Sequence, residues 1–399
     1  MVRLSEGLRP YFGPLKRAYT VGTGVVSPLT SRLSKVRGGW LPTGVAMTME
    51  DAARDGGAFT LARPEEVLHR DHPIGDPARY WCFEEALTET AERVGVVELA
   101  GGRVLQPHSV VITGRNRWLW EQCRYFGTTK PRQHPMFLHP FPQPPQEVAG
   151  RLGVLSTRGD ANYYHFLHDL LPRLAVLEQS GVERPERWYA PYSKGWQRDL
   201  LKIWGIGPDE VVDSSTVPHV RAESLVVPSL ASIDERNPPW VSALIRERMV
   251  PAGLERVPGR HLYLTRGAAR NNRIVLNEAE VVGYLEPLGF QVVDTGVLSI
   301  DEQVRIFAEA DVIVAPHGAA LANLPFCSPG SALVELFPSQ CMFPDFWKVA
   351  CGVEGLDYRY LAGAGPAVPA TRAAFVVADI TVDLGKLEAM VSALLAARA

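Results

Sequence analysis

The stretch from Asp311 to Pro338 constrains the fold of this chain more than any other. An apolar run over residues 312–315 predicts a strand, a Pro-His-Gly turn follows, and small residues over 319–324 predict a short helix. A Pro/Gly turn then leads into a second apolar run over residues 332–337. Strand, helix and strand in this order form a βαβ unit, in which a crossover helix joins two parallel strands. The sequence therefore predicts an α/β fold.

His317, Gly318 and Ala319 occupy the turn between the first strand and the helix, which is where open α/β sheets bind ligands. The N–H groups of a helix start attract anions, and Gly318 has no side chain to keep a phosphate away from the backbone. Glu335 in the second strand offers a carboxylate to sugar hydroxyls. An ordinary buried crossover explains the same residues, because neither a GxGxxG nor a GxxxxGK[ST] motif is complete.

The length of 399 residues exceeds what one hydrophobic core usually holds, and the sequence pattern divides the chain into three parts. Residues 1–60 are rich in Gly and Pro with weak periodicity, which predicts an irregular N-terminal arm. The first domain spans residues 61–238, where strand and helix patterns alternate regularly from residue 153 and predict parallel strands and a helix over residues 162–179. The second spans residues 239–399, where helix starts are predicted at Asn277 with Glu280 and at Ser299 with Glu302, and a helix is predicted at the C-terminus. The Pro-rich segment 234–239 joins the two domains. We therefore expect two Rossmann-like domains facing a cleft.

Composition and charge exclude several classes of protein. The net charge of −3 gives no global field that would attract nucleic acid or an acidic polymer. The five cysteines are scattered, without the spacing of a zinc site or a disulfide framework. No stretch reaches the roughly 18 apolar residues of a membrane span, and the N-terminus lacks the apolar core of a signal peptide. We therefore expect a cytoplasmic protein.

Cations in the N-terminal arm suggest one further location. Arg3, Arg9, Lys16 and Arg17 lie among Leu, Tyr and Phe residues. Such a mixture can contact an anionic membrane surface, which would place the protein at the inner face of a membrane as a peripheral protein. A solvated tail is the simpler explanation of the same residues.

Residues 162–173 (NYYHFLHDLLPR) are the first candidate for chemistry. Helical spacing places His165, His168 and Asp169 on one face. Two imidazoles beside a carboxylate form a candidate general base with an orienting partner. The proline of this segment cannot donate to the His168 carbonyl, so a kink is expected there. In the alternative, the polar face only meets water, and Asp169 pairs with Arg173.

Arg266, Arg270 and Arg273 form the second candidate, directly after the predicted strand at residues 261–265. They leave the carboxyl end of that strand, and arginine forks bind phosphate oxygens bidentately. Together with the helix start at Gly318, they can neutralise a diphosphate without a metal. A solvated basic turn is the alternative. The chain contains no GxSxG, no HExxH and no Asp-x-Asp metal pair.

Three blocks of the sequence resemble glycosyltransferase family 61: NYYHFLHDLLPRL (162–174), LTRGAARNNRIVLNE (264–278) and the block over residues 298–337. The family includes bacterial capsular-polysaccharide biosynthesis proteins and eukaryotic xylosyl- and N-acetylglucosaminyltransferases. The blocks follow one another in the order of the family, and the resemblance covers residues 150–340.

This resemblance implies a GT-B fold and metal-independent, inverting transfer in cell-surface polysaccharide biosynthesis. A nucleotide sugar such as a UDP- or GDP-sugar would bind the C-terminal domain, and a glycan acceptor mainly the N-terminal domain. No cofactor is expected besides this cosubstrate, in agreement with the missing Asp-x-Asp pair. Unlike eukaryotic members, the chain shows no secretory signal or membrane anchor, so we do not expect a Golgi or endoplasmic-reticulum role.

The resemblance also implies roles for individual residues. The catalytic base would be His165, or in second place Asp169, and Asn162, His168 and Arg173 would lie on the acceptor side. The predicted donor-binding residues are Arg266, Arg270, His317, Gly318, Ala319, Asn323 and Glu335.

Two other functions fit a similar fold. A polysaccharide pyruvyltransferase also combines Rossmann-like domains with an arginine-lined anion site, but its donor is phosphoenolpyruvate. A catalytically silent carbohydrate-binding protein would bind glycan and turn over no donor. The sequence does not decide between these alternatives, because function depends on the site rather than on the fold.

Overall fold

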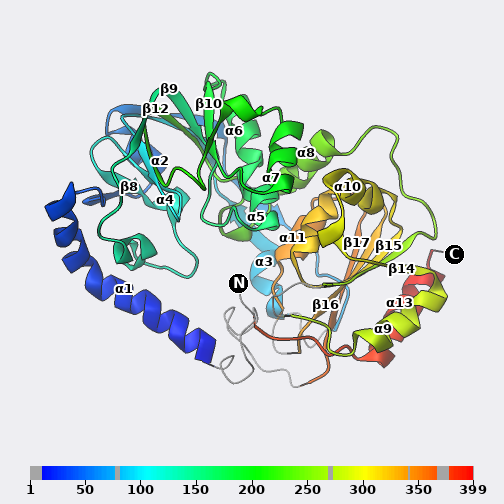
Figure 1. Cartoon of the computed structure of the whole chain (residues 1–399). Coiled ribbons are helices and arrows are strands. Elements are labelled where there is room, and N and C mark those ends of the chain that lie inside the picture. The colour runs from blue at the N-terminus through cyan, green and yellow to red at the C-terminus, as the bar shows by residue number, and fades with distance from the viewer. Residues whose placement is uncertain (1–10, 77–80, 268–272, 340–341, 366–376, 399) are drawn as a thin grey trace. The chain divides into compact units, whose positions relative to one another are not determined.

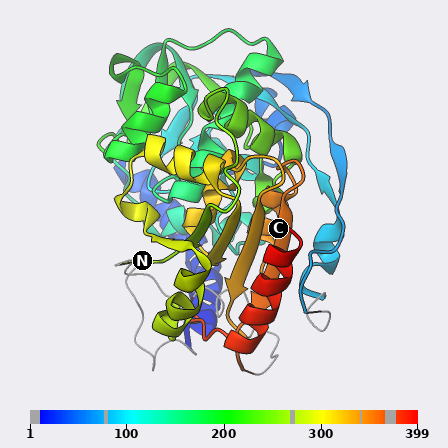
Figure 2. The same ribbon diagram turned by 90° about the vertical axis from the view of Figure 1, so that its right-hand side faces the viewer.

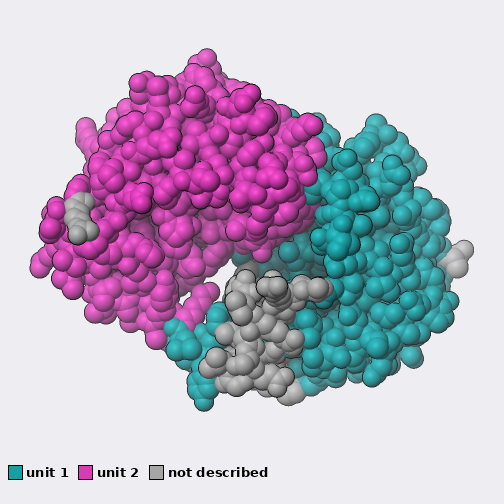
Figure 3. All heavy atoms as spheres, in the orientation of Figure 1, with its two compact units in different colours: residues 1–15, 67–90, 235–399 teal, residues 16–66, 91–234 magenta. Residues whose placement is uncertain are grey.

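The structure is a computed structural model, and it describes residues 11–76, 81–267, 273–339, 342–365 and 377–398. These residues form a mixed α/β protein whose sheets are rich in parallel strand pairs, which confirms the predicted α/β class. The chain divides into two compact units (Figure 3). The C-terminal unit contains residues 1–15, 67–90 and 235–399, and the N-terminal unit contains residues 16–66 and 91–234.

The C-terminal unit is built on a five-stranded sheet in the order β14-β13-β15-β16-β17 (Figure 1). All four neighbouring pairs are parallel. Counted along the chain, this order is 2-1-3-4-5, the flavodoxin-like arrangement of doubly wound sheets. The strands are β13 (His261–Leu264), β14 (Phe290–Val293), β15 (Val312–Pro316), β16 (Ala332–Phe337) and β17 (Asp357–Ala362).

Helices pack on this sheet, so its central strands are buried along their whole length. Every residue of β15 and β16 is buried, as expected for parallel strands packed on both faces. Helices α9 (Glu278–Leu285) and α13 (Leu384–Ala396) lie side by side and share one core with Val312, Val314 and Val334 (Figure 2). The 3₁₀ helix Ala319–Phe326 packs against α8 (Pro239–Met249), α10 (Ile300–Glu309) and α11 (Asp345–Ala350).

Most local predictions for this unit are confirmed. Strand β16 has the predicted bounds, and α10 begins with the predicted capping box, in which Ser299 and Glu302 bind each other's backbone N–H groups. The crossover after β15 is a 3₁₀ helix rather than an α-helix. Asn277 precedes α9 as predicted, but its side chain bonds Val382 in the segment before α13 instead of capping the helix.

The segment Val67–Thr90 belongs to the C-terminal unit, although more than a hundred residues separate it from the main part of that unit, which begins at Glu235. It contains β3 (Glu66–His69), α3 (Glu84–Leu87) and β4 (Thr88–Ala91). Tyr360 of β17 donates to the carbonyl of Asp76 at 2.6 Å, and Lys348 of α11 pairs with Glu89 at 2.7 Å. These contacts show that the sheet edge at β17 is covered by this earlier segment.

The N-terminal unit contains a ten-stranded mixed sheet. Its main path runs β1-β8-β7-β6-β12-β9-β10-β11, and β2 and β5 extend it from β12. The pairs β12–β9, β9–β10 and β10–β11 are parallel, whereas β12 meets β5 and β6 antiparallel. The strands are β1 (Gly44–Ala46), β2 (Gly57–Arg63), β5 (Val94–Ala100), β6 (Arg103–Leu105), β7 (Val110–Ile112), β8 (Arg117–Leu119), β9 (Gln146–Val154), β10 (Arg187–Ala190), β11 (Val211–Asp213) and β12 (His219–Pro228).

Helix α1 is the largest departure from the local predictions. Residues Phe12–Ser34 form a 23-residue helix where we expected irregular backbone. The sequence hid it because three glycines and two prolines interrupt its pattern, and its buried side chains are Thr23, Ser27 and Ser34 rather than apolar residues. Further along, α2 (Met49–Ala53), α4 (Trp120–Cys123) and α7 (Gly195–Ile203) complete the helices of this unit outside the candidate site.

Candidate active site

The carboxyl ends of β13 and β15 meet where the strand order of the C-terminal unit reverses. From β13 the chain turns outward to β14, and it then crosses back to β15 on the other side of β13. Connections leave in opposite directions at such a point, and open α/β sheets bind ligands there. Thr265, Arg266 and Gly267 follow β13, and His317 and Gly318 follow β15. The predicted donor residues that follow β13 and β15 therefore lie together at the carboxyl-terminal end of one sheet.

Arg266 joins the two loops. Its Nη1 nitrogen donates to the carbonyl oxygen of His317 at 3.0 Å. Its Nε atom is buried and has no hydrogen-bond partner among the described residues. Burial lowers the pKa of Arg266 below its usual value, and the charge of Asp379 acts in the opposite direction. A buried guanidinium with an unused N–H suits an anionic ligand at this edge.

Gly318 leaves the room that Arg266 occupies. A Cβ atom at position 318 would lie 2.1 Å from Arg266 Nη1, far inside van der Waals contact. Gly267 has φ +49 and a Cβ there would lie 1.9 Å from Asp294 Oδ2, so both its conformation and its surroundings require glycine. The two glycines thus leave room for the side chains of Arg266 and Asp294.

His317, Glu335 and Tyr358 form a buried chain behind the loops. His317 Nδ1 lies 2.6 Å from Glu335 Oε1, and the hydroxyl of Tyr358 donates to Glu335 Oε2 at 2.5 Å. Burial raises the pKa of Glu335 well above 4.5, and it raises the pKa of Tyr358 as well. Glu335 has an exposed fraction of 0%, and both its oxygens bind protein groups. This geometry differs from the predicted contact with sugar hydroxyls, because Glu335 holds the imidazole of His317 instead.

The remaining predicted donor residues occupy different positions. Ala319 opens the 3₁₀ helix directly after Gly318 and is partly exposed. Asn323 lies inside that helix with an exposed fraction of 0%, and its amide donates to Gln303 of α10 at 2.8 Å. Arg270 lies outside the described residues. Arg273 has φ +70, and its backbone N–H donates to Asp379 at 2.9 Å.

In the N-terminal unit, the predicted helix at residues 162–179 is divided into three parts. It comprises α5 (Tyr163–His165), a π-helix (Phe166–Leu170) and α6 (Pro172–Ser180). The N–H of Leu171 donates to the carbonyl of Phe166 at 3.1 Å, five residues earlier. Pro172, which has no N–H, then opens α6. The predicted kink thus takes the form of a π-helical turn, a feature frequent at functional sites.

His165 and Asp169 lie on facing positions of this widened turn. His165 Nδ1 is 2.8 Å from Asp169 Oδ2. Both side chains are mostly buried, with exposed fractions of 16% for His165 and 7% for Asp169. A carboxylate that accepts from Nδ1–H fixes the tautomer, so that Nε2 carries the lone pair that accepts a proton. The predicted base and its orienting partner are therefore in contact.

Asp160 and Gly159, which precede this helix, complete the surroundings of His165. A Cβ at Gly159 would lie 2.7 Å from His165 Cδ2, so the backbone passes directly against the imidazole. Asp160 Oδ2 accepts from the N–H of Thr157 at 2.9 Å, and burial raises the pKa of Asp160 to about 6. The ring of Phe126 lies 5.2 Å from that of His165. A second titratable carboxyl group thus accompanies the imidazole.

The predicted acceptor-side residues divide into one exposed and two buried positions. Asn162 is exposed, and its side chain caps α5 by accepting from the N–H of Tyr164 at 2.9 Å. His168 is fully buried and stacks on Tyr164 with ring centroids 4.8 Å apart. Arg173 is also buried.

The guanidinium of Arg173 binds backbone rather than the carboxylate of Asp169. It donates to the carbonyls of Pro228, Leu155 and Ser156 at 2.8, 3.2 and 2.9 Å. Burial lowers its pKa to about 10, so Arg173 remains charged at neutral pH. It therefore ties α6 to the ends of β9 and β12.

The sequence analysis missed three residues that shape the two sites. Tyr358 lies in β17, and no local pattern connects it with Glu335. Phe346 of α11 packs on His317 with ring centroids 4.9 Å apart. Gly159 does stand three residues before the recognised block, so a Gly-Asp pair at the end of a strand was the available signal. Among the described residues, no group of three or more His, Cys, Asp or Glu side chains is placed to hold a metal ion.

Comparison with known proteins matches a region that contains His165, Asp169, Arg266 and His317. Glycosyltransferase 61 is the family whose pattern matches, over residues 163–334. Protein O-linked-mannose beta-1,4-N-acetylglucosaminyltransferase 2 from Canis lupus familiaris is 33% identical over 108 residues, which cover 25% of this chain and 18% of that protein. The enzyme of the same name from Homo sapiens is 32% identical over 114 residues, covering 27% and 19% of the two chains. This chain thus matches less than a fifth of the length of these animal relatives. Residues 163–334 therefore match glycosyltransferase family 61, as the three sequence blocks predicted.

Proposed function

We propose that this protein is a metal-independent, inverting glycosyltransferase that moves a sugar from a nucleotide-sugar donor to a glycan acceptor. The single observation that carries the proposal is the position of Arg266. Its buried guanidinium has an unused Nε–H and lies at the reversal of strand order, in the space that the missing side chain of Gly318 leaves. A diphosphate is an anion that such a group can bind bidentately.

In the proposed reaction, the His165–Asp169 pair acts on the acceptor, and Arg266 with the loop at Gly318 acts on the donor. His165 Nε2 takes the proton of the acceptor hydroxyl while Asp169 stabilises the imidazolium that forms. The acceptor oxygen bonds to the anomeric carbon of the donor, and the bond from that carbon to the diphosphate breaks. Arg266 and the backbone N–H groups after Gly318 stabilise the charge that develops on the departing diphosphate. Glu335 acts through His317, which it orients.

The proposal includes a GT-B arrangement of two Rossmann-like domains, with the donor on the sheet of β13–β17. Its support is the family match and the 2-1-3-4-5 strand order of that sheet. The relatives' names include transfer of N-acetylglucosamine. We therefore place UDP-N-acetylglucosamine among the donors to be screened first.

Ligand-induced stabilisation tests the proposal, because a ligand that binds only the folded state raises its melting temperature. UDP-N-acetylglucosamine, UDP, GDP, CMP and phosphoenolpyruvate are added separately, first without metal and then with magnesium. We expect one nucleoside diphosphate to stabilise the wild-type protein without metal. Arg266→Ala should abolish this shift, whereas the exposed control Arg305→Ala on α10 should retain it. Stabilisation by phosphoenolpyruvate alone would instead support a pyruvyltransferase.

We also propose that α1 contacts an anionic membrane surface. Its exposed residues include Leu15, Tyr19, Val26, Leu29 and Leu33, which share one helical face, whereas its buried residues are small and polar. Residues 11–35 contain Lys16, Arg17, Arg32 and Lys35 and no acidic residue. An apolar face with flanking cations suits the interface of an anionic bilayer. Within the described residues, none of the helices combines the length and apolar character that spanning a membrane requires.

Vesicle sedimentation tests this contact. The protein should sediment with vesicles that contain phosphatidylserine and remain in solution with vesicles of phosphatidylcholine alone. Leu29→Glu should reduce the bound fraction several-fold, because it places a charge in the apolar face. Ile203→Glu, at an exposed apolar position of α7, serves as the matched control and should bind as the wild type does. Equal sedimentation of the Leu29 variant would contradict the proposed contact.

A further inference from the structure

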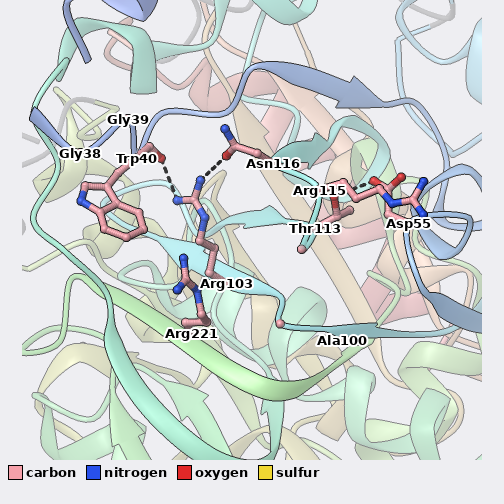
Figure 4. A pocket seen from close by; sticks show the side chains of 12 residues that line it. Gly38, Gly39, Trp40, Asp55, Ala100, Arg103, Thr113, Arg115, Asn116 and Arg221 are labelled. Carbon is pink, nitrogen blue, oxygen red and sulfur yellow. Dashed lines mark hydrogen bonds between the residues drawn. The ribbon is translucent and has the colours of Figure 1, made fainter. Parts of the chain in front are cut away.

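An arginine-lined cavity lies within the N-terminal unit, and most of its lining residues precede the region that matches the family. It has a volume of about 550 Å³ (Figure 4). Its walls include Trp40, Arg103, Arg115, Asn116 and Arg221, with glycines at positions 38, 39, 101 and 114. Three cationic side chains thus line it, and Asp55 is the one acidic residue in its lining.

Arg103 is the buried cation of this cavity. Its exposed fraction is 4%, and its guanidinium donates to the carbonyl of Trp40 at 2.7 Å and to the side-chain oxygen of Asn116. It also lies 2.9 Å from His219 Nε2. His219 Nδ1 is 2.6 Å from the carbonyl of Gln143, so Nδ1 carries the proton and Nε2 accepts from Arg103. All three partners of Arg103 are therefore neutral.

The cavity offers Arg103 no carboxylate. Asp55 accepts from Thr113 at 2.6 Å and from Arg117 Nε at 2.8 Å, so its charge is already paired. Arg221 adds a second cation, whose own partner is the exposed Glu147 at 3.3 Å. Among the described residues, Arg103 forms no ion pair. A buried charge is normally paired, and an uncompensated cation in the wall of a cavity calls for an anion from outside.

Trp40 supplies an apolar surface beside these cations. The guanidinium carbons of Arg221 and Arg103 lie 5.2 and 5.8 Å from its ring centroid. Gly38 has φ +85, and a Cβ there would lie 2.6 Å from Trp40 Nε1, so the turn that positions the indole requires glycine. Figure 4 shows the indole and the two guanidinium groups gathered on one side of the cavity. An aromatic face beside cations suits a ring with an apolar face and an attached anionic group.

Strand register separates this cavity from His165. Arg103 pairs with Arg221 across β6 and β12, and Arg221 pairs with Glu147 near the start of β9. His165 follows the opposite, carboxyl end of β9. The seven steps from Glu147 to Val154 span roughly 20 Å of strand, so Arg103 and Arg221 lie far from the end of β9 that His165 follows.

We propose that this cavity binds a sugar that carries an anionic group. The anion lies between Arg103 and Arg221, and the sugar ring packs on Trp40. A carboxylate of a uronic acid and the phosphate of a sugar phosphate share this chemistry. Binding at this site involves no bond making and is independent of the donor site at Arg266.

Isothermal titration calorimetry with three ligands tests the proposal and separates the two sources of anion. Glucuronate presents the carboxylate, glucose 6-phosphate presents the phosphate, and glucose presents neither. We expect at least one of the anionic sugars to bind the wild-type protein and glucose not to bind. The anionic sugar that gives heat identifies the source.

Two variants that each change one residue of the cavity lining test whether the ligand binds there. Arg221→Gln and Trp40→Leu should each weaken binding by about tenfold or more, because the first removes a charge and the second the stacking surface. Arg187→Gln, an exposed arginine of β10, is the matched control and should leave binding unchanged. Thermal unfolding confirms that each variant is folded. No binding of either anionic sugar, or equal binding by Arg221→Gln, would overturn the proposal.

Discussion

The Nη1 nitrogen of Arg266 donates to the carbonyl oxygen of His317 at 3.0 Å. This bond joins the loop after β13 to the loop after β15 at the point where the strand order reverses. The imidazole of the same residue, His317, is held by Glu335, whose Oε1 lies 2.6 Å from His317 Nδ1. Buried charge, backbone and imidazole thus form one connected unit at the edge of the sheet.

Gly318→Ala should disturb this unit while leaving the fold intact. Its Cβ would lie 2.1 Å from Arg266 Nη1, so the guanidinium must move and its bond to His317 is lost. We expect the affinity for the stabilising nucleoside diphosphate to fall by about tenfold or more, as measured by calorimetry. Gly283→Ala in α9 is the control, because nothing lies within 4 Å of a Cβ there. It should leave affinity unchanged and stabilise the helix by about 0.5–1 kcal/mol. Unchanged affinity in Gly318→Ala would argue against the role of Arg266.

Tyr358→Phe should destabilise the C-terminal unit. The variant removes the hydroxyl that donates to Glu335 Oε2 at 2.5 Å and leaves a fully buried carboxyl oxygen without that donor. An unsatisfied buried polar group costs about 1–3 kcal/mol in the free energy of unfolding. Urea denaturation measures the loss. In Glu335→Leu/Tyr358→Phe the effect of the tyrosine change should largely vanish, and additive losses would contradict a shared interaction.

Asp169→Asn should lower turnover more than it lowers acceptor binding. The amide cannot stabilise a positive charge on His165 Nδ1, which lies 2.8 Å from Asp169 Oδ2 in the native protein. A positioned base contributes about 10²–10⁴-fold to a rate, so we expect kcat to fall by an amount in this range while KM changes little. The pH-rate profile of the variant should shift on its acidic side. Gln179→Ala, an exposed change on α6, provides the control. A normal kcat in Asp169→Asn would exclude this partnership.

His219→Gln should make the folded protein less sensitive to acid. Burial lowers the pKa of His219 from 6.5 to about 4, and the neighbouring Arg103 and Arg221 charges act in the same direction. Between these values the unfolded chain binds a proton that the folded protein does not, so stability falls as pH falls from about 6.5 to about 4.

The size of this effect follows from one proton. The slope contributed by His219 is about 1.4 kcal/mol per pH unit, and the variant should lose it. Urea denaturation over this pH range measures the slope. Burial also lowers the pKa of His108 and His134, to about 4 and about 3, so part of the acid sensitivity should remain in the variant. An identical slope in wild type and variant would contradict the assignment of a neutral, buried His219.

Local sequence patterns correctly predicted those helices and strands whose bounds depend only on their own residues. The capping box of Ser299 and Glu302 marked the start of α10, and unbroken apolar runs marked β15 and β16. Patterns failed for α1, because its buried positions carry Thr and Ser while Leu and Val are exposed. The alternation from residue 153 onward correctly predicted the parallel pairs among β9, β10, β11 and β12. It gave no sign of the antiparallel pairs that β12 forms with β5 and β6, since alternation of elements does not fix strand partners.

The sequence by itself determined the α/β class, the glycosyltransferase 61 region and the contact between His165 and Asp169, because four residues of helix bring two side chains together. Only the tertiary structure decided how Arg266 meets Gly318 and how Glu335 meets Tyr358. It also decided that Arg103 and Arg221 share a cavity. These partners come from different strands, and their meeting depends on strand order and register. The physical reason is that side-chain periodicity reports burial along one element, whereas long-range pairing follows from how the whole sheet assembles.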